Sequence, residues 1–492
     1  MSSPLGSRLE SDRQHPTSGA RVLANFSSLA VARVVGAALE FVAQIVVARA
    51  WGPAAFGTVV FGRVAANYFG IVADPGLSMI GMRRVAQRPV EGGREWWQFM
   101  KARAITSGGA ALLMAAFALL LAPTTARATV LGYVLLVVPF GLSFEWLFKG
   151  LERMWLVALV RVLRAAAFLA LTLVIVQRST VPALYAIGEG LSWCLSSAVF
   201  YLGAKQYLTA GTRREPVPSV ESLVRTAMPI GFAWLLATAY QLGAVVLLTF
   251  LSGAEQAGLY GAAQRPVIFL QGFGVLLGES LVAIFVRAGG PRVRGELTLR
   301  ICLTTLAILL PLTIAVSFGS QQVAELVFGR RFLAAGPVLG LLVWQGLLLL
   351  LNIPFYVTLI ASRHESVYLR AIAAGAMATL LLDLLAVPHF GALGAAVVGV
   401  LVEASVLTLI VVPTLTQLEM NRAGTRVAVM LAVGGVACAI GLVIPVPVFW
   451  RVGLVGLIGW LGCGIAIRGL FPRAYSTMLA SEGMRIEVSE QI

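Results

Sequence analysis

The stretch 23–80 reads LANFSSLAVARVVGAALEFVAQIVVARAWGPAAFGTVVFGRVAANYFGIVADPGLSMI. It contains two apolar runs of membrane-spanning length, 23–48 and 56–80, and each run holds one internal arginine, Arg33 or Arg63. An ionised arginine at the centre of a spanning helix costs about 2.5–3.5 kcal/mol on insertion scales, so such residues usually face the bundle interior and serve a function. We therefore expect a helical membrane protein with fixed positive charge inside it.

The composition agrees with a membrane protein. Of 492 residues, 59% are hydrophobic and 12% are charged, whereas soluble domains carry about a quarter charged residues. Apolar windows of about 20 residues recur along the chain. We predict an all-α polytopic protein of about fourteen transmembrane helices, at 23–48, 56–80, 104–122, 129–148, 155–177, 181–203, 226–251, 258–286, 301–323, 334–360, 367–387, 391–413, 426–447 and 450–469.

The loops between these runs predict the orientation. If the N-terminus is cytoplasmic, that side collects 26 Lys and Arg and the opposite side collects six. Cytoplasmic loops carry the excess of positive charge, so we expect both termini in the cytoplasm. The net charge of +15 does not indicate nucleic-acid binding, because the cations lie in short loops between apolar runs.

An internal repeat predicts two helical bundles. WGPAAFGTVVFGRV (51–64) is similar to LSGAEQAGLYGAAQRPV (251–267), and Gly52 and Gly57 match Gly253 and Gly258. Transporters are commonly built from duplicated bundles with the binding site between them. We expect pseudo-twofold symmetry and this division: a disordered cytoplasmic tail (1–20), a six-helix bundle (21–204), a linker (205–225), a second six-helix bundle (226–415), two additional helices (416–470) and a cytoplasmic tail (471–492).

Polar residues form stripes within the predicted helices. Steps of seven and four residues place Arg33, Glu40 and Gln44 on one helical face, and Arg265 shares a face with Glu279. Polar stripes in lipid face the bundle interior or a wet cavity. The candidate residues for binding an anionic substrate are Arg33, Arg63, Arg265, Asn67, Gln271, Gln345 and Asn352.

A structural explanation of the same arginines stays open. Arg33 with Glu40, and Arg63 with Asp74, are too distant along one helix but could pair between helices. Two further arginines, Arg161 and Arg164, are more simply explained by side chains that extend to the cytoplasmic interface.

Carboxylates in the predicted helices suggest coupling to an ion gradient. Glu40, Asp74, Glu279 and Asp383 are candidates to bind H⁺ or Na⁺. The three histidines lack companions with metal-ligand spacing, and no nucleotide-binding or nucleophile motif occurs. We expect no catalytic residues, no resident metal and no enzymatic activity.

Four segments resemble a known family. ARAWGPAAFGTVVFGRVAANYFGIVADPGL (48–77), AGLYGAAQRP (257–266), ELVFGRRFLAAGPVLGLL (325–342) and PHFGALGAAVVGVLVEASVL (388–407) are similar, in this order, to segments of bacterial polysaccharide repeat-unit flippases. These belong to the multidrug/oligosaccharidyl-lipid/polysaccharide (MOP) exporter superfamily. The resemblance extends over about 20–415.

The resemblance implies a flippase of the bacterial inner membrane for O-antigen or exopolysaccharide synthesis. Its implied substrate is an undecaprenyl-pyrophosphate-linked oligosaccharide, moved from the cytoplasmic to the periplasmic leaflet by alternating access. Related lipid II flippases keep arginines on helices one, two and eight, which correspond here to Arg33, Arg63 and Arg265. The implied partners are membrane lipids, a polysaccharide polymerase and glycosyltransferases.

Two other transport functions stay open, a lipid II flippase and a cation-coupled multidrug exporter of the same superfamily. A drug exporter needs an acidic or aromatic cavity, whereas the stripes here are basic. A membrane glycosyltransferase, polymerase or ligase is disfavoured, because such enzymes need a large extracytoplasmic loop that this chain lacks.

Overall fold

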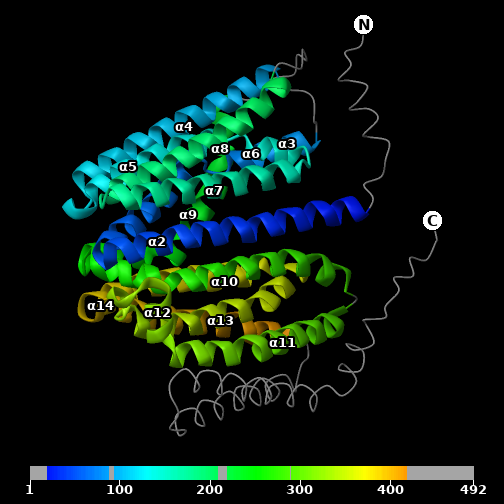
Figure 1. Ribbon diagram of the computed structural model, residues 1–492. Coiled ribbons are helices and arrows are strands. Elements are labelled where there is room, and N and C mark those ends of the chain that lie inside the picture. Colours follow the sequence, from blue (N-terminus) through cyan, green and yellow to red (C-terminus); the bar gives the residue numbers. More distant parts are fainter. Residues whose placement is uncertain (1–18, 88–92, 209–218, 289, 418–492) are drawn as a thin grey trace. The chain divides into compact units, whose positions relative to one another are not determined.

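The computed structural model describes residues 19–87, 93–208, 219–288 and 290–417 (Figure 1). Every regular element in these ranges is a helix. The helices are α2 (Gly19–Ala73), α3 (Leu77–Gln87), α4 (Gly93–Leu120), α5 (Thr124–Leu142), α6 (Glu145–Gly150), α7 (Met154–Arg178), α8 (Pro182–Leu208), α9 (Val220–Leu251), α10 (Ala254–Arg287), α11 (Gly290–Phe318), α12 (Ser320–Phe328), the 3₁₀ helix η1 (Arg330–Phe332), α13 (Ala335–Ala361) and α14 (Glu365–Gln417).

The described helices confirm the expected all-α membrane fold. Ten of them are long and apolar enough to cross a bilayer. Lipid offers no hydrogen bonds to the backbone, so apolar chain segments within it must satisfy their own backbone groups as helices. The first twelve predicted spans coincide with these helices, and the last two, 426–447 and 450–469, lie outside the described residues.

Two of the ten are each a pair of helices joined at a glycine. In α2 the break is Gly52, with φ 81°, and in α14 it is Gly391, with φ 53°. Glycine adopts this left-handed conformation at little cost. Gly52 lies in the loop predicted between 23–48 and 56–80, whereas Gly391 is the first residue of the predicted span 391–413 and directly follows the predicted loop.

The chain forms two compact units, 1–258 and 259–492. Helix α9 belongs to the first unit because it packs against α2, α3 and α4. The division between the units falls at 258/259, near the start of α10, and the boundary in the linker 205–225 stays a prediction. About half of that linker, 209–218, lies outside the described residues, as do nearly all of both predicted tails.

The first unit has two cores. In one, α2, α4 and α5 pack around Tyr133 and Phe61, and α8 packs along α5. In the other, aromatic side chains from α4, α6 and α8 surround Trp146, with Trp96 5.3 Å away between ring centroids. Helix α3 covers this second core with Leu77 and Val85. These cores fix the helices that carry the polar residues described below.

The second unit is centred on α13. Helices α11, α12 and α14 pack against it. Thr298 of α11 and Thr358 of α13 share a buried hydrogen bond of 2.7 Å between their hydroxyl oxygens. The polar residues of α13 are therefore enclosed by neighbouring helices.

The repeated glycines have equivalent positions in the fold. Gly52 and Gly253 both have positive φ, 81° and 90°, and each precedes a helix. Five residues later, Gly57 and Gly258 meet within the first unit. A Cβ on Gly57 would lie 1.7 Å from the carbonyl oxygen of Ala254, so the two backbones touch only because side chains are absent. This agrees with the repeat that the sequence predicts.

Candidate functional site

Two ion pairs lie inside the first unit, between its transmembrane helices. Arg63 of α2 pairs with Glu189 of α8, and Arg164 of α7 pairs with Glu40 of α2. The side chains of Glu189 and Arg164 are 6% and 11% exposed, whereas Arg63 and Glu40 are 25% and 26% exposed. In each pair, therefore, one side chain is largely buried and the other is partly exposed.

Helix α8 joins the two pairs into one cluster. Trp193 follows Glu189 by four residues, so both lie on one face of α8. The Arg164 guanidinium lies 4.5 Å above the centre of the Trp193 ring, a cation–π contact. We call Glu40, Arg63, Arg164, Glu189 and Trp193 the α2–α7–α8 cluster.

This cluster corrects two interpretations of the sequence. Arg164 does not extend to the interface, because Glu40 and Trp193 hold it inside the unit. The alternative that Arg63 pairs with Asp74 is also excluded, since Arg63 pairs with Glu189 and Asp74 with Arg103. A carboxylate on an apolar helix needs a cation or a hydrogen-bond donor nearby. By that rule, Glu189 and Glu40 each require a partner on a neighbouring helix, which the structure shows to be Arg63 and Arg164.

The other candidates of the first unit are less enclosed. Arg33 is partly buried on α2, seven residues before Glu40, and Asn67 is exposed. Both remain candidates for substrate contact. Because Glu40 pairs with Arg164, we describe it as the partner of an arginine and not as an isolated ion-binding group.

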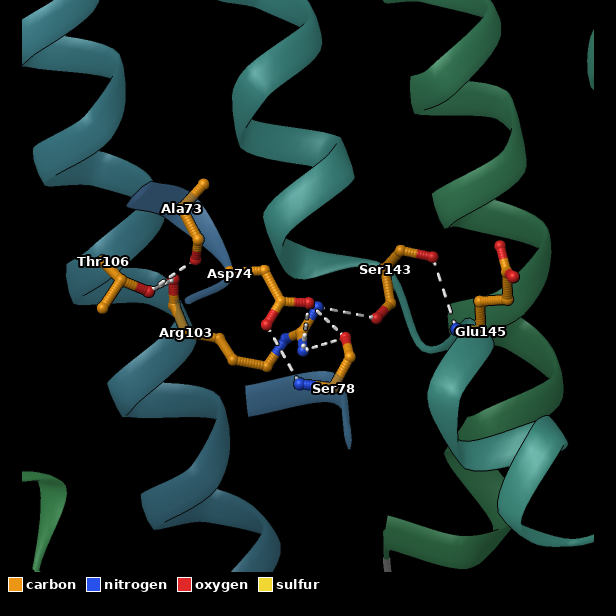
Figure 2. Close-up of polar contacts among 7 residues, drawn as sticks. All are labelled: Ala73, Asp74, Ser78, Arg103, Thr106, Ser143 and Glu145. Carbon is orange, nitrogen blue, oxygen red and sulfur yellow. Dashed lines mark hydrogen bonds and ion pairs between the residues drawn. The ribbon is translucent and has the colours of Figure 1, made fainter. Parts of the chain in front are cut away.

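Asp74 has a structural environment that the sequence does not indicate. Its carboxylate accepts hydrogen bonds from the backbone and hydroxyl of Ser78 and pairs with Arg103 at 3.4 Å (Figure 2). Arg103 also donates to Ser78 Oγ at 2.8 Å and to the carbonyl oxygen of Ser143 at 3.2 Å. Asp74 thus caps α3 and binds a buried guanidinium, which leaves it poorly suited to ion coupling.

The predicted span 104–122 leaves Arg103 just outside it, in a cytoplasmic loop, and this placement is wrong. The segment 81–103 contains most of α3 and the start of α4, and Arg103 is 1% exposed within the first unit. The reason is that α4 begins well before its apolar part, so Arg103 lies within the helix and not in a loop. A single cation at the edge of an apolar window cannot be assigned to loop or span by composition alone.

Arg161 is likewise held by a partner. Its Nη2 lies 2.6 Å from Glu145 Oε1, and Lys149 Nζ lies 2.7 Å from the same oxygen. The expected extension toward the interface is therefore replaced by a pair between α7 and α6.

The second unit contains the remaining candidates. Arg265 and Gln271 are partly buried on α10, and Glu279 is exposed on the same helix. Gln345 of α13 lies against α14, where a Cβ on Gly399 would be 3.0 Å from its Oε1. Asn352 is 5% exposed, and its Oδ1 has no hydrogen-bond partner among the described residues.

Asp383 is the most enclosed carboxylate of the predicted set. It is 1% exposed on α14, and neither carboxylate oxygen has a hydrogen-bond partner within the described ranges. An ionised carboxylate is costly to bury without a hydrogen-bond partner. Within the same ranges, no three His, Cys, Asp or Glu side chains are grouped as metal ligands.

Comparison with known proteins places this geometry in context. A family model described as polysaccharide biosynthesis protein matches residues 22–287. A search of curated proteins finds no significant match.

Solved structures share the fold at low sequence identity. A lipid II flippase MurJ in an inward closed conformation aligns with TM-score 0.70 and 12% identity, over 91% of this chain and 99% of its own. An inward-facing multidrug resistance MATE transporter of the MOP superfamily aligns with TM-score 0.59 and 15% identity, over 80% and 99%. A MOP superfamily transporter from Pyrococcus furiosus aligns with TM-score 0.54 and 16% identity, over 81% and 96%. The chain thus shares the fold of these transporters.

Proposed function

Because this chain belongs to the polysaccharide biosynthesis protein family, we propose that it is a flippase for an undecaprenyl-pyrophosphate-linked oligosaccharide. The substrate enters from the cytoplasmic leaflet of the bacterial inner membrane and leaves from the periplasmic leaflet. Both termini are cytoplasmic in this proposal, as the distribution of loop cations predicts.

The observation that carries the proposal is that this chain, a member of the family, has arginines on its transmembrane helices. Arg33 and Arg63 lie on α2, and Arg265 lies on α10. A guanidinium makes paired, charge-assisted hydrogen bonds to phosphoryl oxygens, so these arginines suit a pyrophosphate group. Asn67, Gln271, Gln345 and Asn352 would supply neutral hydrogen bonds to the remaining polar part of the substrate.

We assign coupling to an ion gradient chiefly to Asp383. Its carboxylate is buried without a hydrogen-bond partner among the described residues, so binding H⁺ or Na⁺ would remove an uncompensated charge. Loss of that ion would restore the charge and favour a different arrangement of the second unit. Glu279 is exposed and is a weaker candidate, and Asp74 is occupied by Arg103.

A lipid II flippase is the second candidate, favoured by the structural likeness to MurJ. It uses the same pyrophosphate chemistry and differs in the sugar. A multidrug exporter is less favoured, because a cationic drug needs an acidic or aromatic cavity, whereas the candidate substrate-binding residues are arginines and neutral amides.

The test uses Arg33→Ala, Arg63→Ala and Arg265→Ala in a strain that lacks the chromosomal copy. We expect each variant to abolish surface polysaccharide while the protein remains in the membrane at normal abundance. Arg370→Ala, at an exposed position of α14, is the matched control and should restore polysaccharide. Full complementation by all three arginine variants would exclude the proposed function.

A further inference from the structure

The arginine best placed for substrate in the first unit already has an anionic partner. Arg63 pairs with Glu189, and its neighbour in the cluster, Arg164, pairs with Glu40. We propose that the lipid-linked pyrophosphate binds by exchange, in which it replaces Glu189 on Arg63 and Glu40 on Arg164. This makes Arg164 a further substrate-binding arginine, and it rests on the proposed function.

The two guanidinium groups contact side chains on successive turns of α8. Glu189 and Trp193 are four residues apart on α8, and side chains so spaced are about 5–6 Å apart between their Cβ atoms. Arg63 contacts Glu189, and the Arg164 guanidinium lies over the Trp193 ring. The two arginines therefore lie about one helical turn apart along α8. A diphosphate carries charge on two adjacent groups and can engage both.

Trp193 keeps Arg164 in place while its anionic partner changes. The indole ring lies under the guanidinium at 4.5 Å, and Phe140 packs edge-on against the indole with ring centroids 5.3 Å apart. These contacts do not depend on Glu40. The Nη1 atom of Arg164 has no hydrogen-bond partner among the described residues, so it is a donor for an incoming phosphoryl oxygen.

Charge balance requires the released carboxylates to take up protons. The cluster holds two arginines and two glutamates, so it is neutral before substrate arrives. A bound pyrophosphate would take the arginine partner away from each carboxylate, and the loss of an ionic partner inside the unit has a high cost. Each released glutamate therefore accepts one proton from water and becomes a neutral acid. No covalent bond of the substrate changes in this step.

Other charged groups near the cluster do not supply this compensation. On α2, Arg33 lies seven residues from Glu40, about 10 Å along the helix axis. On α7, Arg161 is paired with Glu145 of α6. Helix α5, which packs against α2 and α8, carries only Arg127, near its start. The surroundings therefore favour anion binding once the glutamates are neutral.

The experiment measures binding of inorganic pyrophosphate to the purified full-length chain in nanodiscs by calorimetry at pH 8. Neutral Glu189→Gln and Glu40→Gln each remove one competing carboxylate. We expect each variant to bind pyrophosphate about tenfold or more tightly than the wild type, which corresponds to the loss of one competing ion pair. Arg164→Ala should weaken binding by a similar factor.

Proton uptake provides a second readout that a merely structural role would not change. Titrations in two buffers of different ionisation enthalpy give the protons taken up per pyrophosphate bound. We expect fewer protons for Glu189→Gln and Glu40→Gln than for the wild type, because each variant lacks one carboxylate that can accept a proton. The protonation of pyrophosphate itself is the same in all cases and does not affect the comparison. Glu296→Gln removes an exposed pair with Arg300 and should match the wild type in both readouts.

The outcomes separate this inference from the proposed function. Unchanged or weaker binding by both Gln variants, with binding lost in Arg63→Ala, would overturn the exchange and leave the flippase function standing. Absence of pyrophosphate binding in the wild type and in both Gln variants would also overturn it. If Glu189→Gln fails to fold, judged by size-exclusion chromatography, Glu40→Gln decides, since Glu40 is the more exposed carboxylate.

Discussion

Arg103 of α4 binds Asp74 at the junction of α2 and α3, at 3.4 Å between Nη1 and Oδ2 (Figure 2). The same guanidinium donates to the Ser143 carbonyl, where α5 ends and α6 begins. One buried arginine therefore connects two helix breaks of the first unit. Next to it, the Thr106 hydroxyl donates to the Ala73 carbonyl at the end of α2 at 2.7 Å.

Arg103→Ala should destabilise the first unit strongly. The side chains of Arg103 and Asp74 are 1% and 8% exposed, and removing one partner of a buried pair typically costs about 3–5 kcal/mol. Thermal unfolding of the purified protein in detergent measures the effect. Lys101→Ala, two residues away at an exposed position, should leave the midpoint nearly unchanged. Equal midpoints for both variants would contradict a stabilising role for the pair.

Glu40 and Arg164 should be energetically coupled. Residues in direct ionic contact show interaction energies of about 0.5–3 kcal/mol in double-mutant cycles. We expect Glu40→Gln and Arg164→Gln, combined, to destabilise the protein less than the sum of the single changes. The cycle is measured by thermal or denaturant unfolding in detergent. Strict additivity would show that the contact contributes nothing to stability.

Gly57→Ala should disrupt the contact between the two repeated loops. The new Cβ would meet the backbone carbonyl of Ala254, which cannot move aside as a flexible side chain can. Forced overpacking typically costs about 1–3 kcal/mol, so we expect lower stability and reduced surface polysaccharide. Gly243→Ala is the control, because a Cβ there meets no atom within 4 Å. A wild-type phenotype for Gly57→Ala would contradict the close approach.

Asp383→Asn should uncouple transport from the ion gradient. The amide cannot exchange a proton and binds Na⁺ more weakly than a carboxylate, whereas its size is nearly the same. In proteoliposomes, we expect the variant to flip a lipid-linked oligosaccharide at a rate that no longer responds to an imposed pH or Na⁺ gradient. Glu365→Gln, at the exposed start of the same helix, should keep the response. A normal gradient response in Asp383→Asn would move the coupling site elsewhere.

The positions of the helices were predictable because they depend on local properties of the chain. Apolar length and backbone hydrogen bonding are set within about 20 residues. The break at Gly52 was predicted as a loop for the same reason, and the break at Gly391 lies at the predicted start of the span 391–413. Arg103 was misplaced because α4 extends beyond its apolar part, and hydropathy does not record such an extension.

The candidate site was predictable only in part. Helical periodicity placed Arg33, Glu40 and Gln44 on one face, but it does not identify the helix that this face meets. The partners Arg164 and Glu189 lie more than 100 residues from Glu40 and Arg63 in the chain. Their pairing depends on how α2, α7 and α8 pack.

The sequence by itself determined an all-helical membrane protein, the described spans and the arginines within them, because lipid imposes those features on each segment separately. The tertiary structure decided which charges meet: Arg63 with Glu189, Arg164 with Glu40, and Arg103 with Asp74. Ion pairing acts over a few ångströms in space, and only the packing of helices brings distant parts of a chain that close.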